Sequence, residues 1–317
     1  MVKILASVIV SSGLLFSAEV ITLYKSGGKK LIEKETLSTS YWSGDVNRKD
    51  LRFGYFERAF SLLSCNKEKG VLELYAPDAQ KRFSLKKRYG ALTGKYAGDK
   101  MVEGDLRTPI GIYNLVQKKK TVDPFYGPMA FVTSYPNLYD RIRGKNGSGI
   151  WVHGVPLSGT RESFTRGCIA INNNDLIQLD RSINPADTLL IIDSAPKKPV
   201  EPAAYSAILA GLHQWKYAWT YNDLESYLSF YDPSFKRFDG MGLSQFKSFK
   251  ERIFAKNEVK TITFNNINII PYPGEKRNLF LVTFDQVYVS DSHRFEGEKS
   301  LLVALKGDKT ISILTEE

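Results

Sequence analysis

One histidine and one cysteine stand close together in a chain that has only three histidines and two cysteines. His153 begins the sequence His-Gly-Val-Pro (153–156), and Cys168 lies in Thr-Arg-Gly-Cys-Ile (165–169). A thiol is an effective nucleophile only as the thiolate, and a neighbouring imidazole is the usual group that takes its proton. Gly167 lets backbone amides approach a reacting carbonyl because it has no side chain. If the two side chains meet in space, the pattern predicts an acyl-transfer enzyme.

The other cysteine and the other histidines are predicted to be structural. Cys65 lies in Leu-Leu-Ser-Cys (62–65) and is expected to be a small core residue. In an oxidising compartment two cysteines often form a disulfide, so a bond between Cys65 and Cys168 is an alternative. The setting of Cys168 favours a reduced thiol. His213 is expected to pack in an apolar helix, and His293 to lie on a turn.

The first 18 residues have the composition of a secretory signal peptide. Lys3 is followed by an apolar run and then by small residues, so we expect cleavage after Ala18 and export to the periplasm. An uncleaved membrane anchor is the alternative, but the run is shorter than the ~20 residues that a spanning helix needs. No later segment is apolar enough to cross a membrane, so we expect no stable membrane insertion after cleavage.

The charge balance restricts the partners. The formal net charge is +10, with 25% charged and 43% hydrophobic residues, which is typical of a globular protein. An exported basic protein suits an anionic cell-wall polymer. A solvated basic surface without a partner explains the charge equally well. Export argues against nucleic acid as a partner.

An α+β fold with three parts is predicted from the distribution of strand-like and helix-like segments. The parts are a small N-terminal domain over 19–70, a β-rich catalytic domain over 71–195 and an α+β domain over 203–317; a proline-rich linker over 196–202 joins the last two. In the first part, Trp42, Tyr55 and Phe56 could form a small hydrophobic platform. We expect that part either to pack on the next domain or to form a homodimer.

The last part has a helical segment over 203–231 and then long strands over 261–270, 278–290 and 300–305. This order is similar to the cone-shaped fold of the nuclear transport factor 2-like family. Four aromatic residues of the helical segment could line a pocket, although core packing explains their spacing better; they are Trp215, Trp219, Tyr227 and Tyr231.

Three separated blocks resemble the YkuD-type L,D-transpeptidase domain. They are the sequence from Gly98 to Tyr113, the pair His153-Gly154, and Thr-Arg-Gly-Cys-Ile at 165–169, in the family's order. The resemblance covers residues 71–193. Within the family it is strongest to the LD-carboxypeptidases that trim cell-wall tetrapeptides in helical bacteria, which also have a short N-terminal domain and a C-terminal nuclear transport factor 2-like domain.

The resemblance implies a mechanism for the blocks. Cys168 is the expected nucleophile, and His153 takes the thiol proton and later gives it to the leaving amine. The backbone carbonyl of Gly154 orients the imidazole, and amides around Gly167 and Cys168 form the oxyanion hole. No cofactor and no metal is implied, because a lone histidine and cysteine make a poor zinc site.

Three residues are candidates for substrate binding: Trp151, Thr165 and Arg166. Arg166 stands where many family members have histidine, while Ala170 stands where many have arginine. The positively charged residue therefore lies before Cys168 in this sequence instead of after it. Arg166 could bind a substrate carboxylate, or it could be a solvated or structural arginine. Trp151 should share a strand face with His153, as a core residue or as a substrate platform.

The predicted function is that of a cysteine-dependent peptidoglycan LD-carboxypeptidase, a hydrolase that removes the terminal D-Ala from tetrapeptide stems and so influences cell shape. One alternative is an L,D-transpeptidase that forms or breaks 3–3 crosslinks or protein–wall links. A non-catalytic wall-binding module is an alternative of another class. The stretch between His153 and Thr165 is short for the family, which weakens the case for the transpeptidase.

Overall fold

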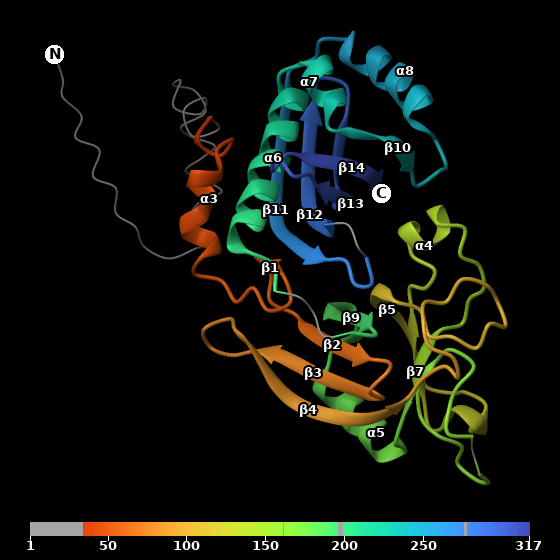
Figure 1. Cartoon of the computed structure of the whole chain (residues 1–317). Helices are drawn as coiled ribbons and strands as arrows, with labels where there is room; N and C mark the ends of the chain where they lie inside the picture. The colour runs from red at the N-terminus through yellow and green to blue at the C-terminus, as the bar shows by residue number, and fades with distance from the viewer. Residues whose placement is uncertain (1–33, 161, 196–198, 276–277) are drawn as a thin grey trace.

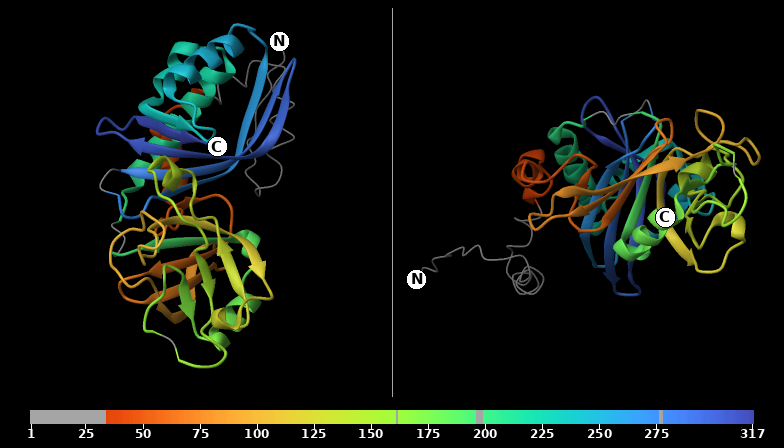
Figure 2. Two further views of the ribbon diagram at one scale, coloured as in Figure 1. Left: turned by 90° about the vertical axis from the view of Figure 1, so that its right-hand side faces the viewer. Right: turned by 90° about the horizontal axis from the view of Figure 1, so that it is seen from below.

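The computed structural model describes residues 34–160, 162–195, 199–275 and 278–317. The predicted signal peptide, the start of the predicted N-terminal domain and part of the predicted linker lie outside the described residues. The described chain forms two bodies, a β-barrel and a domain built on a six-stranded sheet, stacked on each other (Figure 1, Figure 2). The α+β class predicted from the sequence is confirmed.

Eight strands close the barrel in the order β2-β3-β4-β8-β7-β6-β5-β9. Their bounds are Ser61–Asn66 (β2), Val71–Pro77 (β3), Phe83–Leu92 (β4), Gly111–Lys119 (β5), Ala130–Thr133 (β6), Trp151–His153 (β7), Ile169–Ile171 (β8) and Thr188–Asp193 (β9). Several are rich in β-branched and aromatic residues, which fit a pleated surface. Inward side chains from successive strands form one buried cluster, which includes Leu63, Val152, Ile169 and Leu190.

Short helices and 3-10 turns connect the barrel strands. Helix α4 (Leu138–Ile142) follows β6, and turn η1 (Pro124–Tyr126) follows β5. Turn η2 (Pro185–Asp187) precedes β9. Helix α5 (Asn173–Ser182) directly follows β8, and its N-cap is Asn172.

The second body has a sheet in the order β1-β11-β12-β13-β14-β10. Its strands are Tyr55–Phe56 (β1), Tyr231–Arg237 (β10), Lys260–Pro271 (β11), Leu279–Ser290 (β12), Arg294–Leu305 (β13) and Ile311–Glu316 (β14). Its helices are Pro202–Thr220 (α6), Leu224–Ser229 (α7) and Leu243–Phe254 (α8). Figure 1 shows α6 running along β11 and β12 on one face of the sheet.

The segment predicted as one helix over 203–231 is divided. Asn222 has a positive φ of 59°, and the Asp223 side chain accepts from the amide of Ser226, which starts a new helix. Tyr231 already belongs to β10. The break lets the aromatic residues of both helices point into one core.

The predicted N-terminal domain over 19–70 is not a separate body in its described part. Helix α3 (Thr39–Val46) packs on α6, where Gln214 Nε2 donates to Leu37 O at 2.7 Å. Strand β1 pairs with β11, and β2 is a barrel strand paired with β3 and β9. The barrel therefore begins near residue 61 and not at 71, because the apolar faces of this segment are needed by the two larger cores.

The three aromatic residues predicted to form a platform take part in these cores instead. Tyr55 is buried among the residues under α6, and Trp42 packs on the same cluster. Phe56 packs on the cluster between the two bodies. They do not form a surface for a partner, and homodimer formation stays a prediction without this support.

The two bodies meet through an apolar cluster that both of them build. On β12 the even-numbered residues Phe280 and Val282 face α6, whereas Leu279 and Leu281 face the barrel. The barrel contributes outward side chains of β2, β5 and β9, namely Leu62, Ile112 and Ile191. A polar contact supports the cluster, because Asn137 Nδ2 donates to Tyr272 Oη at 2.9 Å.

In the part of the chain that the structure describes, we find no helix with the length and apolarity needed to cross a membrane.

Candidate active site

The predicted nucleophile and base lie on two neighbouring parallel strands. In the register of β7 and β8, Val152 is opposite Ile169 and His153 is opposite Ala170. Val152 and Ile169 point into the barrel core, so the alternate residues point to the outer face. Cys168 directly precedes β8 and shares the face of Ala170. Cys168 and His153 are therefore diagonal neighbours on one face of the strand pair.

His153 is held in one tautomer by its own chain. The ring is buried, and its Nδ1 lies 2.6 Å from the carbonyl oxygen of Gly154. A carbonyl can only accept, so Nδ1 carries the proton and Nε2 keeps its lone pair. The ring of Tyr126 meets the imidazole edge-on, with centroids 5.0 Å apart. An imidazole oriented in this way can accept a proton at Nε2.

Two neighbours fix the carbonyl of Gly154. The amide of Gly154 donates to Tyr126 O at 2.9 Å, and the next amide, that of Val155, donates to Asn173 Oδ1 at 2.9 Å. A Cβ on Gly154 would overlap Asn173 Oδ1, so a larger residue here would displace the side chain that accepts from Val155. The sequence reasoning missed Asn173, although the Asn-Asn-Asn run after β8 marked a helix start with several amide side chains.

The turn before Cys168 depends on Gly167, which has a φ of 133°. A Cβ there would lie 2.9 Å from Arg107 O and 3.1 Å from Ile150 Cδ1. The amide of Gly167 donates to Thr165 Oγ1 at 3.0 Å. Gly167 thus permits close packing, and in this structure its N–H is used inside the turn, so the predicted role of this amide in an oxyanion hole stays a prediction.

Thr165 is also better explained as part of the turn than as a substrate contact. Its side chain is buried, and its hydroxyl donates to Cys168 O at 2.6 Å while accepting from Gly167. Both ends of the turn are thus tied to one hydroxyl. The structure thus shows Thr165 bracing the turn, and its predicted role in substrate binding stays a prediction without support from these contacts.

The thiol itself lies at the edge of the strand pair. Trp151 N donates to Cys168 Sγ at 3.4 Å, and Sγ donates to Gly149 O at 3.3 Å. Cys168 is partly exposed. A sulfur that accepts from a backbone amide and shares a strand face with an imidazole can be deprotonated, and its partial exposure lets it reach a ligand.

The loop between β4 and β5 packs against the turn that precedes Cys168 and is hydrogen-bonded to it. Thr165 N donates to Thr93 O at 2.7 Å, and Gly94 N donates to the buried Thr108 Oγ1 at 2.8 Å. The ammonium of Lys67 donates to the carbonyls of Gly98 and Thr108. Burial lowers the pKa of Lys67 to about 8. The segment 93–110, here called the support loop, is thereby fixed to the barrel.

Aromatic and basic side chains surround the thiol and the imidazole. Trp151 lies on the face of His153, half-buried, with Tyr126 at 5.1 Å between ring centroids. Lys119 Nζ lies 5.2 Å from the centre of the Trp151 ring. Arg166 is exposed, and among the described residues no carboxylate lies within ion-pair distance of it. Lys119 is a cation that the sequence reasoning missed, because β5 is distant in the chain.

Two family models match the chain. The model of the L,D-transpeptidase catalytic domain matches residues 65–192, and that of the Cds6 C-terminal NTF2-like domain matches residues 207–317. Among solved structures, the helical cell shape determining protein Pgp2 from Campylobacter jejuni is 37% identical, with a TM-score of 0.82 over 89% of this chain and 100% of that chain. The chain belongs to the L,D-transpeptidase family.

Further matches agree with this membership. A variant of Pgp2 gives a TM-score of 0.83, and Bd1075 from Bdellovibrio bacteriovorus gives 0.66 at 28% identity over 85% of this chain and 96% of that chain. The comparison with curated proteins found no match. The family resemblance predicted from the sequence is confirmed, and this L,D-transpeptidase-family protein is a peptidoglycan-active enzyme.

The second cysteine of this L,D-transpeptidase-family protein is separate from the site. Neither Cys65 nor Cys168 is in a disulfide, which excludes the predicted alternative of a bond between them in this structure. Cys65 is fully buried in β2, and burial raises the pKa of its thiol to about 12. A thiol of that kind is inert. Across the described ranges, no group of three histidine, cysteine or acidic side chains is arranged for a metal.

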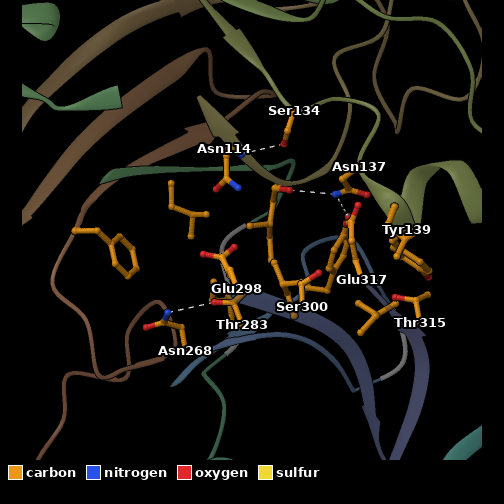
Figure 3. A pocket seen from close by; sticks show the side chains of 18 of the residues that line it. Asn114, Ser134, Asn137, Tyr139, Asn268, Thr283, Glu298, Ser300, Thr315 and Glu317 are labelled. Atoms are coloured by element: carbon orange, nitrogen blue, oxygen red, sulfur yellow. Dashed lines mark hydrogen bonds between the residues drawn. The ribbon is translucent and has the colours of Figure 1, made fainter. Parts of the chain in front are cut away.

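A hollow of about 370 Å³ lies between the two bodies, away from Cys168. Figure 3 shows Asn114 and Ser134 of the barrel on one side, with Thr283, Glu298 and Ser300 of the sheet facing them. Most of its polar groups bond to each other or to backbone. It therefore reads as the unfilled part of the interface between the bodies.

The C-terminal domain has a second hollow of about 450 Å³, which Trp219 and the buried Lys250 line. Lys250 Nζ lies 4.8 Å from the centre of the Trp219 ring, and burial lowers the pKa of Lys250 to about 8. Of the four aromatic residues predicted for a pocket, Trp219 alone lines this hollow. The others are core residues: Trp215, Tyr227 and Tyr231.

Proposed function

We propose that the protein is an exported, cysteine-dependent peptidoglycan LD-carboxypeptidase that removes the terminal D-Ala from tetrapeptide stems. The observation that carries the proposal is the placement of Cys168 and His153 on one face of β7 and β8, with Gly154 O fixing the imidazole tautomer. This is the geometry that cysteine acyl transfer needs, because Nε2 is left to accept the thiol proton.

The reaction follows from these groups. His153 Nε2 takes the proton of Cys168, and the thiolate attacks the carbonyl carbon of the bond to D-Ala. Developing negative charge on the oxygen is stabilised by the amide of Cys168 rather than that of Gly167, which is occupied. The imidazolium gives its proton to the leaving amine, and D-Ala departs. Water, deprotonated by His153, then hydrolyses the thioester and restores the thiol.

Two side chains are proposed to hold the substrate. Arg166 is exposed beside the thiol turn, and its guanidinium suits a peptide carboxylate as a bidentate pair. Trp151 lies on the face of His153, where its ring can cover the stem peptide. Truncating either side chain should raise KM more than it lowers kcat, since neither takes part in proton transfer.

A role in cell shape is proposed from the relatives. Pgp2 is a helical cell shape determining protein, and the present chain matches all of its resolved length. Trimming a stem peptide removes a substrate for crosslinking, so a carboxypeptidase can change wall curvature. Export through the predicted signal peptide would place the enzyme beside its substrate.

The test is product analysis by mass spectrometry. Purified protein incubated with a disaccharide-tetrapeptide should release one alanine and leave the tripeptide, and Cys168→Ala should release none. Cys65→Ala is the matched control, because it removes the other thiol from a buried site and should retain activity.

Other products would support a different function. A crosslinked dimer in the same incubation would identify a transpeptidase. No product, together with slow alkylation of Cys168 by iodoacetamide near neutral pH, would favour a wall-binding module and would reject the proposed reaction.

A further inference from the structure

The turn between β11 and β12 of the C-terminal domain reaches the barrel next to the support loop (Figure 1). Gly274 in this turn has a φ of 72°, and a Cβ there would lie 2.7 Å from Ile110 Cγ2. Next to it, Glu275 Oε1 accepts from Tyr139 Oη at 3.1 Å. The turn is therefore docked on the barrel by a close backbone approach and by a carboxylate.

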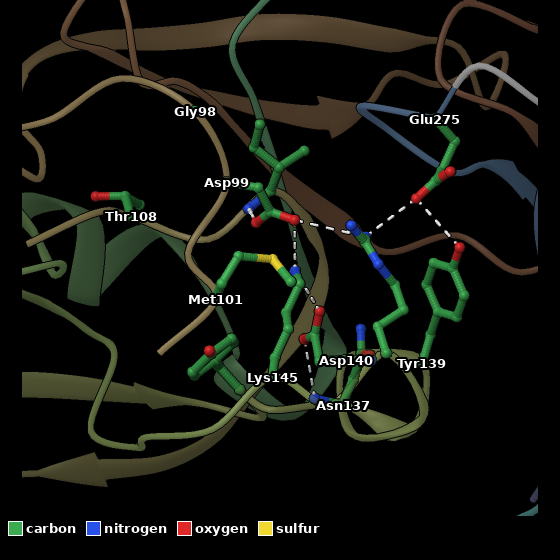
Figure 4. Close-up of polar contacts among 12 residues, drawn as sticks. Gly98, Asp99, Met101, Thr108, Asn137, Tyr139, Asp140, Lys145 and Glu275 are labelled. Carbon is green, nitrogen blue, oxygen red and sulfur yellow. Dashed lines mark hydrogen bonds and ion pairs between the residues drawn. The ribbon is translucent and has the colours of Figure 1, made fainter. Parts of the chain in front are cut away.

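Glu275 also ends a chain of ion pairs that leads into the barrel. Arg143 Nη1 lies 3.0 Å from Glu275 and 3.5 Å from Asp99. Lys145, whose side chain is fully buried, lies 2.7 Å from both Asp99 and Asp140. Figure 4 shows Lys145 pointing at Asp99 and Asp140, and Glu275 facing Tyr139. Buried charges of this kind are stable only when each keeps its partners, so the chain favours one arrangement.

Asp99, at the barrel end of this series of ion pairs, fixes the support loop. Asp99 Oδ1 accepts from Ile110 N at 2.8 Å, which ties together two distant points of the loop. Between them, Thr108 accepts from Gly94, and the carbonyl of Arg107 packs against Gly167. The same loop thus contacts the C-terminal domain at Ile110 and the thiol turn at Arg107.

We propose that Glu275 is a positioning residue for Cys168: the C-terminal domain, through Arg143 and Asp99, holds the support loop against the thiol turn. The inference rests on the proposed role of Cys168 as nucleophile. Without Glu275, Arg143 keeps only its ion pair with Asp99. Asp99 is then drawn toward Arg143, and its hydrogen bond from Ile110 N, which fixes the support loop, is weakened. Small displacements of a catalytic group lower the chemical rate more than they weaken substrate binding.

The experiment compares three variants of the full-length protein. Glu275→Ala should lower kcat by about 2- to 30-fold with KM nearly unchanged. It should also change the rate of Cys168 alkylation and its pH profile, measured by peptide mass mapping. Glu275→Gln keeps an acceptor for Tyr139 and should lie between the alanine variant and the wild type.

Glu317→Ala is the matched control. Glu317 also belongs to the C-terminal domain and lies 3.7 Å from Arg141 of helix α4, the helix that also carries Tyr139, but within the described residues no ion pair joins Arg141 to Asp99. It should leave both kcat and alkylation unchanged. Thermal melting shows whether a variant is folded, and Glu275→Gln supplies the measurement if Glu275→Ala unfolds.

The outcomes separate the two proposals. Wild-type kcat and alkylation in Glu275→Ala, or an equal loss in Glu317→Ala, would overturn the positioning role. If the wild type releases no alanine, the proposed function fails, while the alkylation rates of Cys168 still decide whether Glu275 positions the thiol turn.

Discussion

The barrel and the C-terminal domain each bury a histidine, and the two rings have opposite surroundings. His153 lies on the outer face of β7, with Nδ1 bonded to Gly154 O and a cysteine on the same face. His213 lies in α6 between the rings of Trp42 and Phe264, and neither ring nitrogen has a hydrogen-bond partner among the described residues. Burial is common to both, so burial alone does not indicate a base.

The difference lies in what each backbone offers. A strand edge presents carbonyls and amides to neighbouring side chains, and β7 uses one carbonyl to orient an imidazole. A helix satisfies its own backbone groups, so α6 offers His213 no backbone partner, and its ring packs on Trp42 of α3 and Phe264 of β11. Burial accordingly lowers the pKa of His213 to about 3 and keeps it neutral. The two rings are suited to different tasks, proton transfer and packing.

Substituting each of the two histidines should give the largest difference in kcat. His153→Gln removes the proton acceptor and should lower kcat by about 10²- to 10⁴-fold. His213→Phe replaces one packed ring by another and should change kcat by less than about twofold. Alanine release from a disaccharide-tetrapeptide measures both. Equal losses in the two variants would show that the histidine of β7 is not the base.

The orientation of His153 gives the next prediction. Asn173→Ala leaves the amide of Val155 without its acceptor and frees the Gly154 carbonyl to move, so kcat should fall by about 10- to 100-fold. The control is Asn172→Ala, which removes the N-cap of the same helix and should cost about 1 kcal/mol of stability without this kcat loss. Chemical denaturation and steady-state kinetics separate the two effects. A kcat loss in Asn172→Ala alone would contradict the role of Asn173.

The sequence alone was sufficient to predict the placement of site residues that are close to one another along the chain. His153 ends β7 and Cys168 directly precedes the neighbouring β8, and alternation on β7 predicted that Trp151 and His153 share a face. The family blocks predicted the barrel domain, and the order of one helical segment and then long strands predicted the C-terminal fold. In the last block, Gly167 has a φ of 133°, which favours glycine over other residues.

Contacts between distant segments were not predictable. The segment 19–70 was predicted to be a small domain of its own, yet the apolar faces of its described part complete two cores whose other strands lie far along the chain. The amide of Gly167 looked available because its acceptor, Thr165 Oγ1, depends on a turn conformation that residue types do not specify. The pairing of Glu275 with Arg143 spans the two domains, and neither residue has a local pattern that marks it.

The smallest expected effect concerns the pH dependence of stability. In the unfolded chain a histidine has a pKa of ~6.5, whereas burial lowers the pKa of His213 in the folded state to about 3. Between these values the unfolded chain binds a proton that the folded one does not, so stability falls as the pH drops from about 6.5 toward 3. His213→Phe removes this contribution. Its melting temperature should therefore decline less than that of the wild type between pH 7.5 and pH 5, by roughly a few degrees. Identical declines in the two proteins would mean that the ring in α6 is protonated in the folded state, and the contrast with His153 would then have to rest on hydrogen bonding alone.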